Sequence, residues 1–232
     1  MSPLIRNISD TARWVAVFRA DESERPDAVF HDPFARKLAG ERGDQIADTI
    51  TFSRAHSWSF VARTFSFDAI IQQHVELGFD MVINLAAGLD TRAYRMSLPT
   101  SLQWIEIDFP EMISYKQQML ANELPNCKLE SIQLDLADRK ARIELFDNLN
   151  ARCTKALIVA EGLIGYLDAG EAAALADDLF TQPNFKRWAF DMMSPGLFVL
   201  VQKEMGSFLK DANAPLKFAP PEGEAFFLPH GW

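Results

Sequence analysis

The sequence predicts an α/β fold with a parallel β-sheet covered by helices on both faces. Short apolar segments alternate with helical patterns after residue 80, which is typical of strand–helix–strand units. Small or acidic residues stand where four of these segments end. Ligands of open α/β sheets bind beyond the carboxyl ends of the strands, so this pattern also predicts a binding site.

Five segments have the length and composition of buried strands. They are residues 81–86, 102–108, 129–134, 156–160 and 188–192. Helical patterns lie between and after them, at residues 111–124, 138–149, 170–180 and 197–210. Connections of this kind are right-handed and place helices on both faces of a parallel sheet. The tail, residues 214–232, contains four prolines and is expected to be irregular.

The first 80 residues contain helical patterns only. Residues 11–20 carry an apolar stripe, and residues 58–77 form a longer pattern that Gly78 would end. Asp32 followed by Pro33 predicts a helix start, with the aspartate as its N-cap. We therefore expect residues 1–80 to form a helical cap and residues 81–232 to form the sheet domain, packed as one structural unit.

Composition excludes several classes of protein. The chain has 232 residues, of which 48% are hydrophobic and 24% charged, as in ordinary globular proteins. A net charge of −9 argues against a partner that is a nucleic acid. No apolar run approaches the roughly 20 residues of a membrane helix. The first ten residues lack a secretory signal, so we expect a cytoplasmic protein without a membrane partner.

The cysteines and histidines indicate no metal site. Cys127 and Cys153 fit no zinc-binding spacing, and we expect both to be reduced thiols. The four histidines share no metal-ligand spacing either. The sequence says nothing about the oligomeric state.

A small-residue turn follows the first strand. Ala86, Ala87 and Gly88 would let a ligand approach the backbone closely. The turn has a single glycine, so it matches neither the GxGxxG pattern of dinucleotide-binding proteins nor a phosphate-binding loop, and an NAD-dependent reductase is disfavoured. A tight turn without a ligand is the alternative.

Asp108 ends the second predicted strand, 20 residues after Gly88. In doubly wound folds an acid at this place binds the two hydroxyls of a ribose. Glu106 lies on the same face of the strand and could orient Asp108. The alternative role for Asp108 is an N-cap of the helix that starts near Pro110.

Two further strand ends carry acids. Asp135 could accept a hydrogen bond from the exocyclic amine of an adenine while Leu136 packs on the ring, or Asp135 could face solvent before the helix at Asp138. Glu161 follows the fourth strand, near the central crevice of the sheet. Gly88, Asp108, Asp135 and Glu161 stand at four successive strand ends, and together they indicate a binding site more specifically than any one of them alone.

These residues resemble the leucine carboxyl methyltransferase family, in particular its branch of S-adenosyl-L-methionine-dependent O-methyltransferases. The matching segments are residues 11–35, 61–68, 84–95, 106–116, 134–136, 159–167 and 220–232. The resemblance spans nearly the whole chain. It implies a Rossmann-like class I methyltransferase sheet with a helical N-terminal extension and S-adenosyl-L-methionine as the cofactor.

The resemblance also implies roles for individual residues. Asp108 would bind the ribose of the cofactor, and Asp135 and Leu136 would hold its adenine. Arg63 matches the family arginine that pairs with the cofactor carboxylate, and Glu161 matches an acid near the methionine amine. Gly88 would line the methionine part, beside Ala86.

One departure from the family concerns the end of the sheet. Class I sheets have seven strands, whereas five are predicted here, and the last matching segment stops at Trp232, where family members usually continue. We therefore expect the last two strands to be missing, which would leave the fifth strand as an edge.

The expected function is methyl transfer to a carboxylate or hydroxyl oxygen of a small molecule. A carboxylate needs no general base, whereas a hydroxyl would need one, with Glu161, His56 and His74 as candidates. Tyr166 either borders the acceptor or packs in the core, and no catalytic residue is singled out beyond Glu161 and Tyr166 as candidates.

The alternatives are a protein C-terminal carboxyl methyltransferase and a non-catalytic cofactor-binding domain. Arg92 and Arg95, just after the turn, could attract an anionic acceptor or form salt bridges on a helix surface.

Overall fold

The protein is built around one five-stranded parallel sheet. The computed structural model describes residues 8–211 and 213–232. The strands are β1 (Met81–Leu85), β2 (Gln103–Asp108), β3 (Lys128–Gln133), β4 (Ala156–Ala160) and β5 (Phe185–Phe190), in the spatial order β3-β2-β1-β4-β5. All neighbouring strands pair in parallel. The predicted Rossmann-like α/β class is confirmed.

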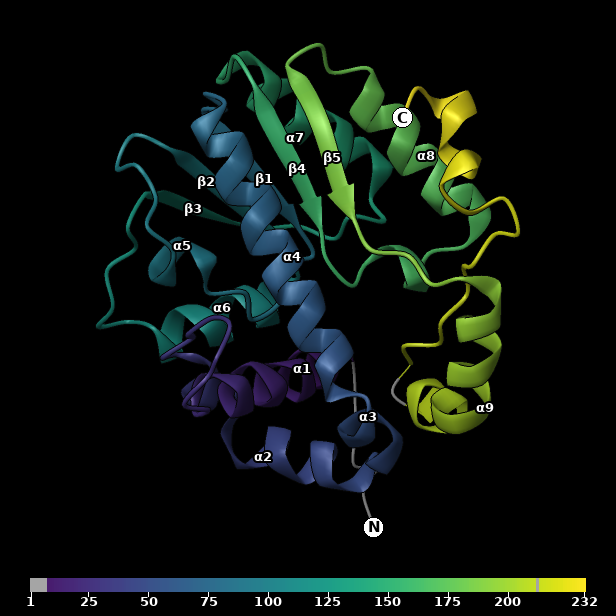
Figure 1. Ribbon diagram of the computed structural model, residues 1–232. Helices are drawn as coiled ribbons and strands as arrows, with labels where there is room; N and C mark the ends of the chain where they lie inside the picture. The colour runs from purple at the N-terminus through teal and green to yellow at the C-terminus, as the bar shows by residue number, and fades with distance from the viewer. Residues whose placement is uncertain (1–7, 212) are drawn as a thin grey trace.

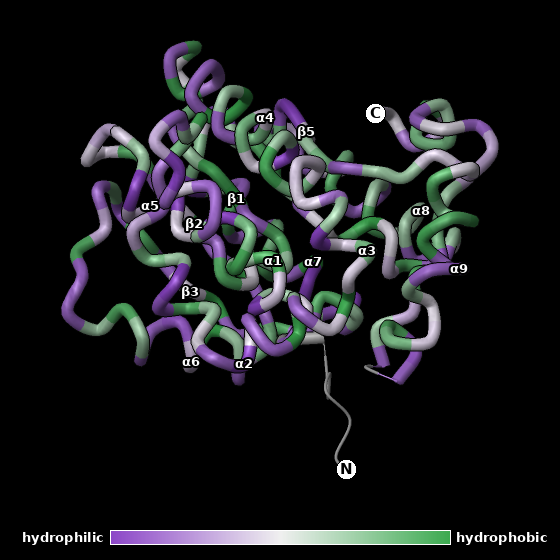
Figure 2. The backbone as a smooth tube through the Cα atoms, turned by 60° about the horizontal axis from the view of Figure 1, so that its bottom comes forward, coloured by the Kyte–Doolittle hydropathy of each residue, from purple (hydrophilic) through white to green (hydrophobic). Residues whose placement is uncertain are grey.

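The two central strands explain why a sheet forms here. Every residue of β1 and β4 is buried, so both faces of these strands need a hydrophobic cover. Figure 2 shows hydrophobic residues, in green, along β1 in the interior of the molecule. Neither strand contains glycine or proline, and the aliphatic side chains suit a pleated, buried backbone.

The helices before the sheet are α1 (Ile8–Ser23), α2 (Ala35–Thr49), α3 (Thr51–Ala55) and α4 (Ser57–Glu76). Figure 1 shows α1, α2 and α3 gathered at the end of the molecule toward which the arrowheads of β4 and β5 point. Helix α4 runs from this end along one face of the sheet, where Phe67 and Ile71 pack against Val82 and Leu157. Gly78, with a φ of 80°, follows the helix as predicted.

The remaining helices alternate with the strands. They are α5 (Arg92–Arg95), α6 (Pro110–Met119), α7 (Arg139–Ala151), α8 (Ala169–Phe180) and α9 (Pro195–Asp211), with 3-10 helices η1 (Ile164–Tyr166) and η2 (Gly223–His230). Phe146 of α7 and Leu175 of α8 pack against Ile83 and Ile158 on the face of the sheet opposite α4. The sheet is therefore the middle of three layers.

Several predicted boundaries were wrong. Helix α2 begins at Ala35 instead of Pro33, and Asp32, whose carboxylate accepts from Arg19 Nε and from the Phe34 amide, precedes the helix without capping its first turn. Helix α6 ends at Met119, five residues before the predicted end at Leu124.

Two predictions for the C-terminal part also differ from the structure. Strand β5 begins at Phe185 instead of Trp188, because its charged, exposed second and third residues hid the apolar pattern. The tail expected to be irregular contains the 3-10 helix η2.

Both cysteines are buried free thiols. Burial raises the pKa of Cys127 and of Cys153 to about 11, so both are neutral near pH 7. None of the helices within residues 8–211 and 213–232 combines the length and apolar composition that crossing a bilayer requires.

Candidate functional site

A cavity of about 980 Å³ opens at the carboxyl ends of the strands. The loops after β1, β2, β3 and β4 form its floor, and residues of α1, α3, α4 and α9 form its walls. All the residues predicted to bind the cofactor contribute to its lining: Arg63, Ala86, Gly88, Asp108, Asp135, Leu136 and Glu161. Chain segments that are about 100 residues apart in the sequence thus surround one space.

The loop after β1 brings its backbone to the cavity. Ala86 and Gly88 have φ values of 50° and 51°, in the left-handed region. This conformation is easy for glycine but strained for alanine, and such strain is concentrated at functional sites. The tight path turns the Gly88 amide toward the end of β2, where it donates to Asp108 Oδ2 at 2.6 Å.

Asp108 is held by two backbone amides. Oδ2 accepts from Gly88 and Oδ1 accepts from the Phe109 amide at 2.7 Å, and the residue is only 8% exposed. Burial raises the pKa of Asp108, and the two amide hydrogen bonds oppose this shift without cancelling it. The carboxylate therefore couples the loops after β1 and β2.

Glu106 does not have the orienting role suggested by its position on β2. Its carboxylate accepts from Lys116 Nζ of α6 at 2.6 Å, and both side chains are buried. Burial raises the pKa of Glu106, although Lys116 opposes the shift. The ion pair holds α6 against β2, two residues before Asp108 in the strand.

Asp135 and Leu136 lie after β3, at the rim of the cavity. Asp135 is exposed, and its Oδ1 accepts from the Ala137 amide at 2.9 Å. Helix α7 is capped by Asp138 instead, which accepts from the Ala141 amide. Asp135 is thus not the cap of this helix.

Glu161, after β4, sits between two arginines. It accepts from Arg63 Nε of α4 at 3.0 Å and pairs with Arg92 Nη1 at 2.8 Å. Burial would raise the pKa of Glu161, but the two guanidinium groups outweigh it and hold the pKa below its usual value. Glu161 is therefore ionised near neutral pH.

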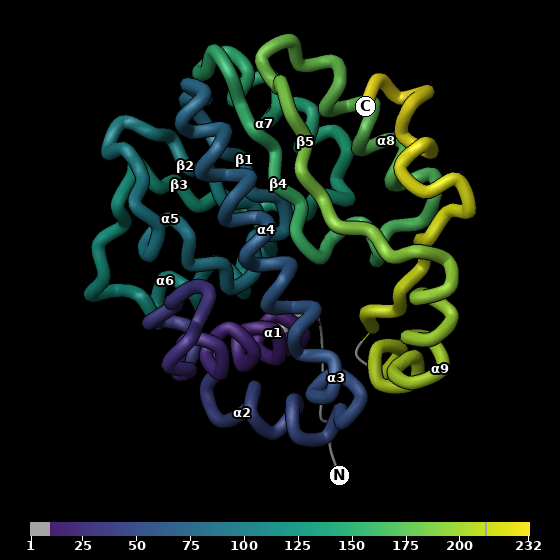
Figure 3. The backbone as a smooth tube through the Cα atoms, viewed as in Figure 1, coloured from purple at the N-terminus to yellow at the C-terminus, as the bar shows by residue number. Residues whose placement is uncertain are grey.

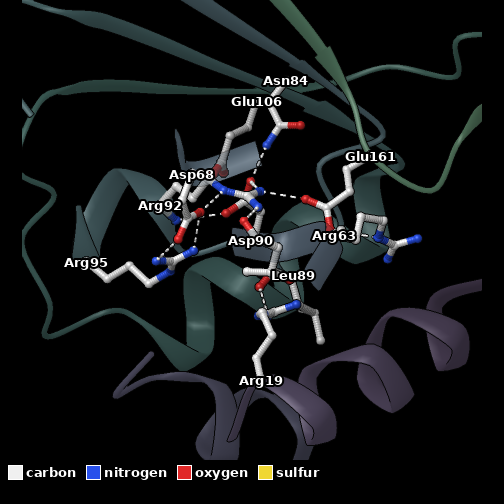
Figure 4. Close-up of polar contacts among 12 residues, drawn as sticks. Arg19, Arg63, Asp68, Asn84, Leu89, Asp90, Arg92, Arg95, Glu106 and Glu161 are labelled. Carbon is white, nitrogen blue, oxygen red and sulfur yellow. Dashed lines mark hydrogen bonds and ion pairs between the residues drawn. The ribbon is translucent and has the colours of Figure 1, made fainter. Parts of the chain in front are cut away.

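Arg92 is the centre of a buried ionic cluster (Figure 4). Besides Glu161, it pairs with Asp68 Oδ1 at 2.6 Å and with Asp90 Oδ2 at 2.8 Å, and Nη2 donates to the Thr64 carbonyl. Arg95 binds both oxygens of Asp68 at 2.7 Å. Burial would lower the pKa of Arg92, but the three carboxylates raise it well above its ordinary value.

This cluster shows that both predicted roles of Arg92 and Arg95, attraction of an acceptor and salt bridges on a helix surface, were wrong. They lie neither on a helix surface nor free to attract an acceptor, since their side chains are 3% and 5% exposed and are paired with buried carboxylates. They connect α4 to the loops after β1 and β4. Arg92 and Arg95 therefore hold the middle of the site together through buried ion pairs, a role that neither alternative predicted.

Asp191 is a site residue that the sequence analysis missed. Its Oδ2 pairs with Arg63 Nη1 at 3.0 Å, and its Oδ1 accepts from the Gly162 amide at 2.5 Å. It directly follows β5 and lines the cavity, just as Glu161 follows β4. A correct end for the fifth strand would have identified it.

The other candidates for catalysis are placed differently. Tyr166 of η1 lines the cavity and also packs in a hydrophobic cluster with Trp14. Burial raises the pKa of Tyr166 above its ordinary value. His56 lines the cavity beside α4, whereas the ring of His74 contacts the Ile70 carbonyl and Phe79 on the other end of that helix.

Comparison with known proteins identifies the relatives of this chain. The model of the leucine carboxyl methyltransferase family matches residues 12–180. A protein of Parafrankia named "Putative S-adenosyl-L-methionine-dependent methyltransferase" is 32% identical over 182 residues, which cover 74% of this chain and 58% of the relative. A protein of Frankia alni with the same description is 35% identical over 175 residues, covering 71% and 61%. The chain thus spans about three fifths of the length of these curated relatives.

Solved structures share the fold. A DUF574 family protein from Streptomyces avermitilis superimposes with a TM-score of 0.67, covering 94% of this chain and 81% of the other. A "putative methyltransferase" from Thermobifida fusca gives a TM-score of 0.62, covering 97% and 80%. Both are 13% identical in sequence, which supports the fold alone. On the family match, which covers most of its length, the chain belongs to the leucine carboxyl methyltransferase family.

Proposed function

We propose that this chain binds S-adenosyl-L-methionine in the cavity and transfers its methyl group to a carboxylate or hydroxyl oxygen of a small molecule. The observation that carries the proposal is the meeting of Gly88, Asp108, Asp135 and Glu161, from four strand ends, around one space with Arg63. The names of the relatives, which describe S-adenosyl-L-methionine-dependent methyltransferases, support the same cofactor.

The residues at the first three strand ends fit a nucleoside. Asp108 presents a carboxylate, which accepts hydrogen bonds from two neighbouring hydroxyls, as a ribose offers. Asp135 and Leu136, at the rim, suit an adenine amine and ring. The backbone of Ala86 and Gly88 leaves room beside Asp108 for the chain that joins the nucleoside to the methionine part.

The charged residues around Arg63 fit the methionine part. A zwitterion would find a guanidinium group for its carboxylate in Arg63 and carboxylates for its ammonium group in Glu161 and Asp191. The connected cluster contains three guanidinium groups and four carboxylates: Arg63, Arg92, Arg95, Asp68, Asp90, Glu161 and Asp191. Its single excess negative charge is opposite to the single net positive charge of S-adenosyl-L-methionine.

The chemistry that the cofactor supplies when bound is an electrophilic methyl carbon, to which the acceptor oxygen bonds as the carbon–sulfur bond breaks and its electron pair passes to sulfur. The protein would contribute mainly by orienting the acceptor, which can lower the barrier by about 7–11 kcal/mol. We infer that the helices before β1 act as the cap over this site and exclude water.

The ionisation of the site favours a carboxylate acceptor. A general base works best with a pKa near 7, whereas the two arginines hold the pKa of Glu161 below its usual value. Glu161 is therefore better suited to bind a positive group than to take a proton. The raised pKa of Tyr166 keeps its hydroxyl protonated, so it can donate a hydrogen bond to an acceptor oxygen.

Calorimetry with S-adenosyl-L-homocysteine, the demethylated product, tests the cofactor assignment directly. We expect saturable binding of one molecule per chain, and the absence of binding would refute the proposal. Turnover is then measured as release of this product from S-adenosyl-L-methionine with a panel of acids and alcohols. Binding without turnover on any acceptor would favour a non-catalytic cofactor-binding protein.

The proposed setting is the cytoplasm. The two buried cysteines are unpaired thiols, which is usual in a reducing compartment.

A further inference from the structure

The cavity has a second, uncharged end. Helix α4 carries Arg63 in its second turn, and its first turn leads away from the charged cluster. With a rise of 1.5 Å per residue, Phe60 lies about 4.5 Å and Trp58 about 7.5 Å from Arg63 along the helix axis. Both line the cavity. The lining therefore changes from ionic to aromatic over two turns of one helix.

Helix α9 forms the opposite wall of this end. Figure 3 shows α3 and the start of α4 on one side and α9 on the other, although about 140 residues separate them in the chain. The lining residues of α9 follow a helical stripe: Leu197, Leu200, Val201, Met205 and Leu209. The charged side chains of α9, such as Lys203 and Glu204, are not part of the lining.

The absence of charge distinguishes this end from the rest of the site. Among the described lining residues, α3, the first turn of α4 and α9 contribute no aspartate, glutamate, lysine or arginine. A charged or strongly hydrated ligand would lose water here without gaining a partner, which is unfavourable. Removing apolar surface of a ligand from water is favourable, so these walls suit an apolar ligand.

The volume allows two ligands. Ligand pockets usually measure about 300–1,000 Å³, and this cavity of about 980 Å³ is at the upper limit. The nucleoside and methionine part would occupy the ends of the strands. The space between α9 and the first turn of α4 belongs to the same cavity but lies beyond the part that the cofactor would fill, so it is left for a second ligand.

We propose that this apolar end binds the methyl acceptor, which is a small molecule with an apolar body and one carboxylate or hydroxyl group. This inference rests on the proposed function and narrows it to a class of acceptor. The polar group would point toward the hydroxyl of Tyr166, which also lines the cavity, and the apolar body would lie between α9 and Trp58. A peptide C-terminus fits less well, because its backbone amides need polar partners that these walls rarely offer.

Two adjacent residues of α9 provide a matched pair of variants. Leu200 lines the cavity and is 41% exposed, whereas Val199 is 67% exposed and does not line it. An aspartate at either position is compatible with folding, because both side chains already contact solvent. Leu200→Asp places a charge inside the apolar end, and Val199→Asp places the same charge outside it.

The experiment measures binding of 1-naphthoate, octanoate, 1-naphthol, acetate and a tripeptide ending in leucine, by calorimetry, with and without S-adenosyl-L-homocysteine. We expect 1-naphthoate or octanoate to bind the wild-type chain at least tenfold more tightly than acetate or the peptide. Leu200→Asp should weaken this binding at least tenfold, and Val199→Asp less than threefold. Affinity for S-adenosyl-L-homocysteine should stay the same in both variants.

The outcomes separate the two proposals. If the wild-type chain does not bind S-adenosyl-L-homocysteine, the proposed function is refuted. In that case, 1-naphthoate binding that Leu200→Asp weakens would still support the apolar subsite. Equal effects of the two variants, or a peptide or acetate that binds as tightly as 1-naphthoate, overturn the inference even when the product binds. Tight binding of 1-naphthol alone would keep the subsite and assign a hydroxyl acceptor.

Discussion

Replacing Asp108 with asparagine tests the nucleoside part of the site most directly. The substitution keeps the shape of the side chain and removes its charge. In the structure both carboxylate oxygens accept from backbone amides, of Gly88 at 2.6 Å and of Phe109 at 2.7 Å. Asparagine has a single acceptor oxygen, so one amide loses its partner. We expect this to lower the free energy of unfolding by about 1–3 kcal/mol.

The effect on binding follows from the lost charge. A hydrogen bond to a charged group contributes about 1.5–3 kcal/mol. Losing that amount from a ribose contact would weaken binding of S-adenosyl-L-homocysteine about 10- to 150-fold. Calorimetry measures the affinity, and urea unfolding measures the stability in parallel, so that the two effects are separated.

Glu111→Gln is the matched control. Glu111 is exposed near the start of α6 and does not line the cavity, so its substitution removes one negative charge nearby without touching the site. We expect its affinity for S-adenosyl-L-homocysteine to stay within threefold of the wild type. An Asp108→Asn protein that binds as tightly as this control would refute the ribose role.

Three further predictions concern the charged cluster. Arg63→Ala should weaken S-adenosyl-L-homocysteine binding at least tenfold, as measured by calorimetry. Arg36→Ala is the control, because Arg36 pairs with other acids outside the cavity, and it should leave this binding unchanged. Equal effects of the two substitutions would show that Arg63 is not part of the binding site. Arg92→Met should destabilise the fold by about 3–5 kcal/mol, because three carboxylates lose a buried partner, and a thermal or urea unfolding change below 1 kcal/mol would contradict this. Because the pKa of Glu161 is lowered, its ion pairs stabilise the fold above the ordinary carboxyl pKa and lose this effect as the pH falls through the lowered value. The difference in unfolding free energy between wild type and Glu161→Gln should therefore shrink from pH 7 to acidic pH. A difference that stays constant with pH would show that the pairs do not stabilise the fold.

The sequence was a good guide to residues that stand at strand ends. Gly88, Asp108 and Glu161 could be found because each stands at the end of an apolar strand or within three residues after it, and the carboxyl ends of parallel strands share one edge of the sheet. Their common cavity is a consequence of topology, which the alternation of strands and helices determines. Local pattern and overall fold agree here, so reasoning from one to the other succeeded.

The sequence was a poor guide where burial depends on distant partners. Asp191 was missed because two exposed charged residues, Lys186 and Arg187, hid the start of β5 and shifted its predicted end past Asp191. Arg92 could not be recognised as buried, since its neutralisation requires Asp68, 24 residues earlier on a different element. Such pairs leave no periodic signal in the chain.

The ionic links between the early helices and the loops around the sheet have a practical consequence for protein engineering. Arg19 of α1 donates to the Leu89 carbonyl at 2.6 Å, and Arg63 and Asp68 of α4 bind Glu161 and Arg92. A shortened protein starting at Met81 would lack these partners. Arg92 and Glu161 would then be partly buried charges with fewer ion pairs. We expect such a fragment to be recovered mainly as aggregate, and a soluble, cooperatively melting fragment would show that the sheet does not need its helical neighbours.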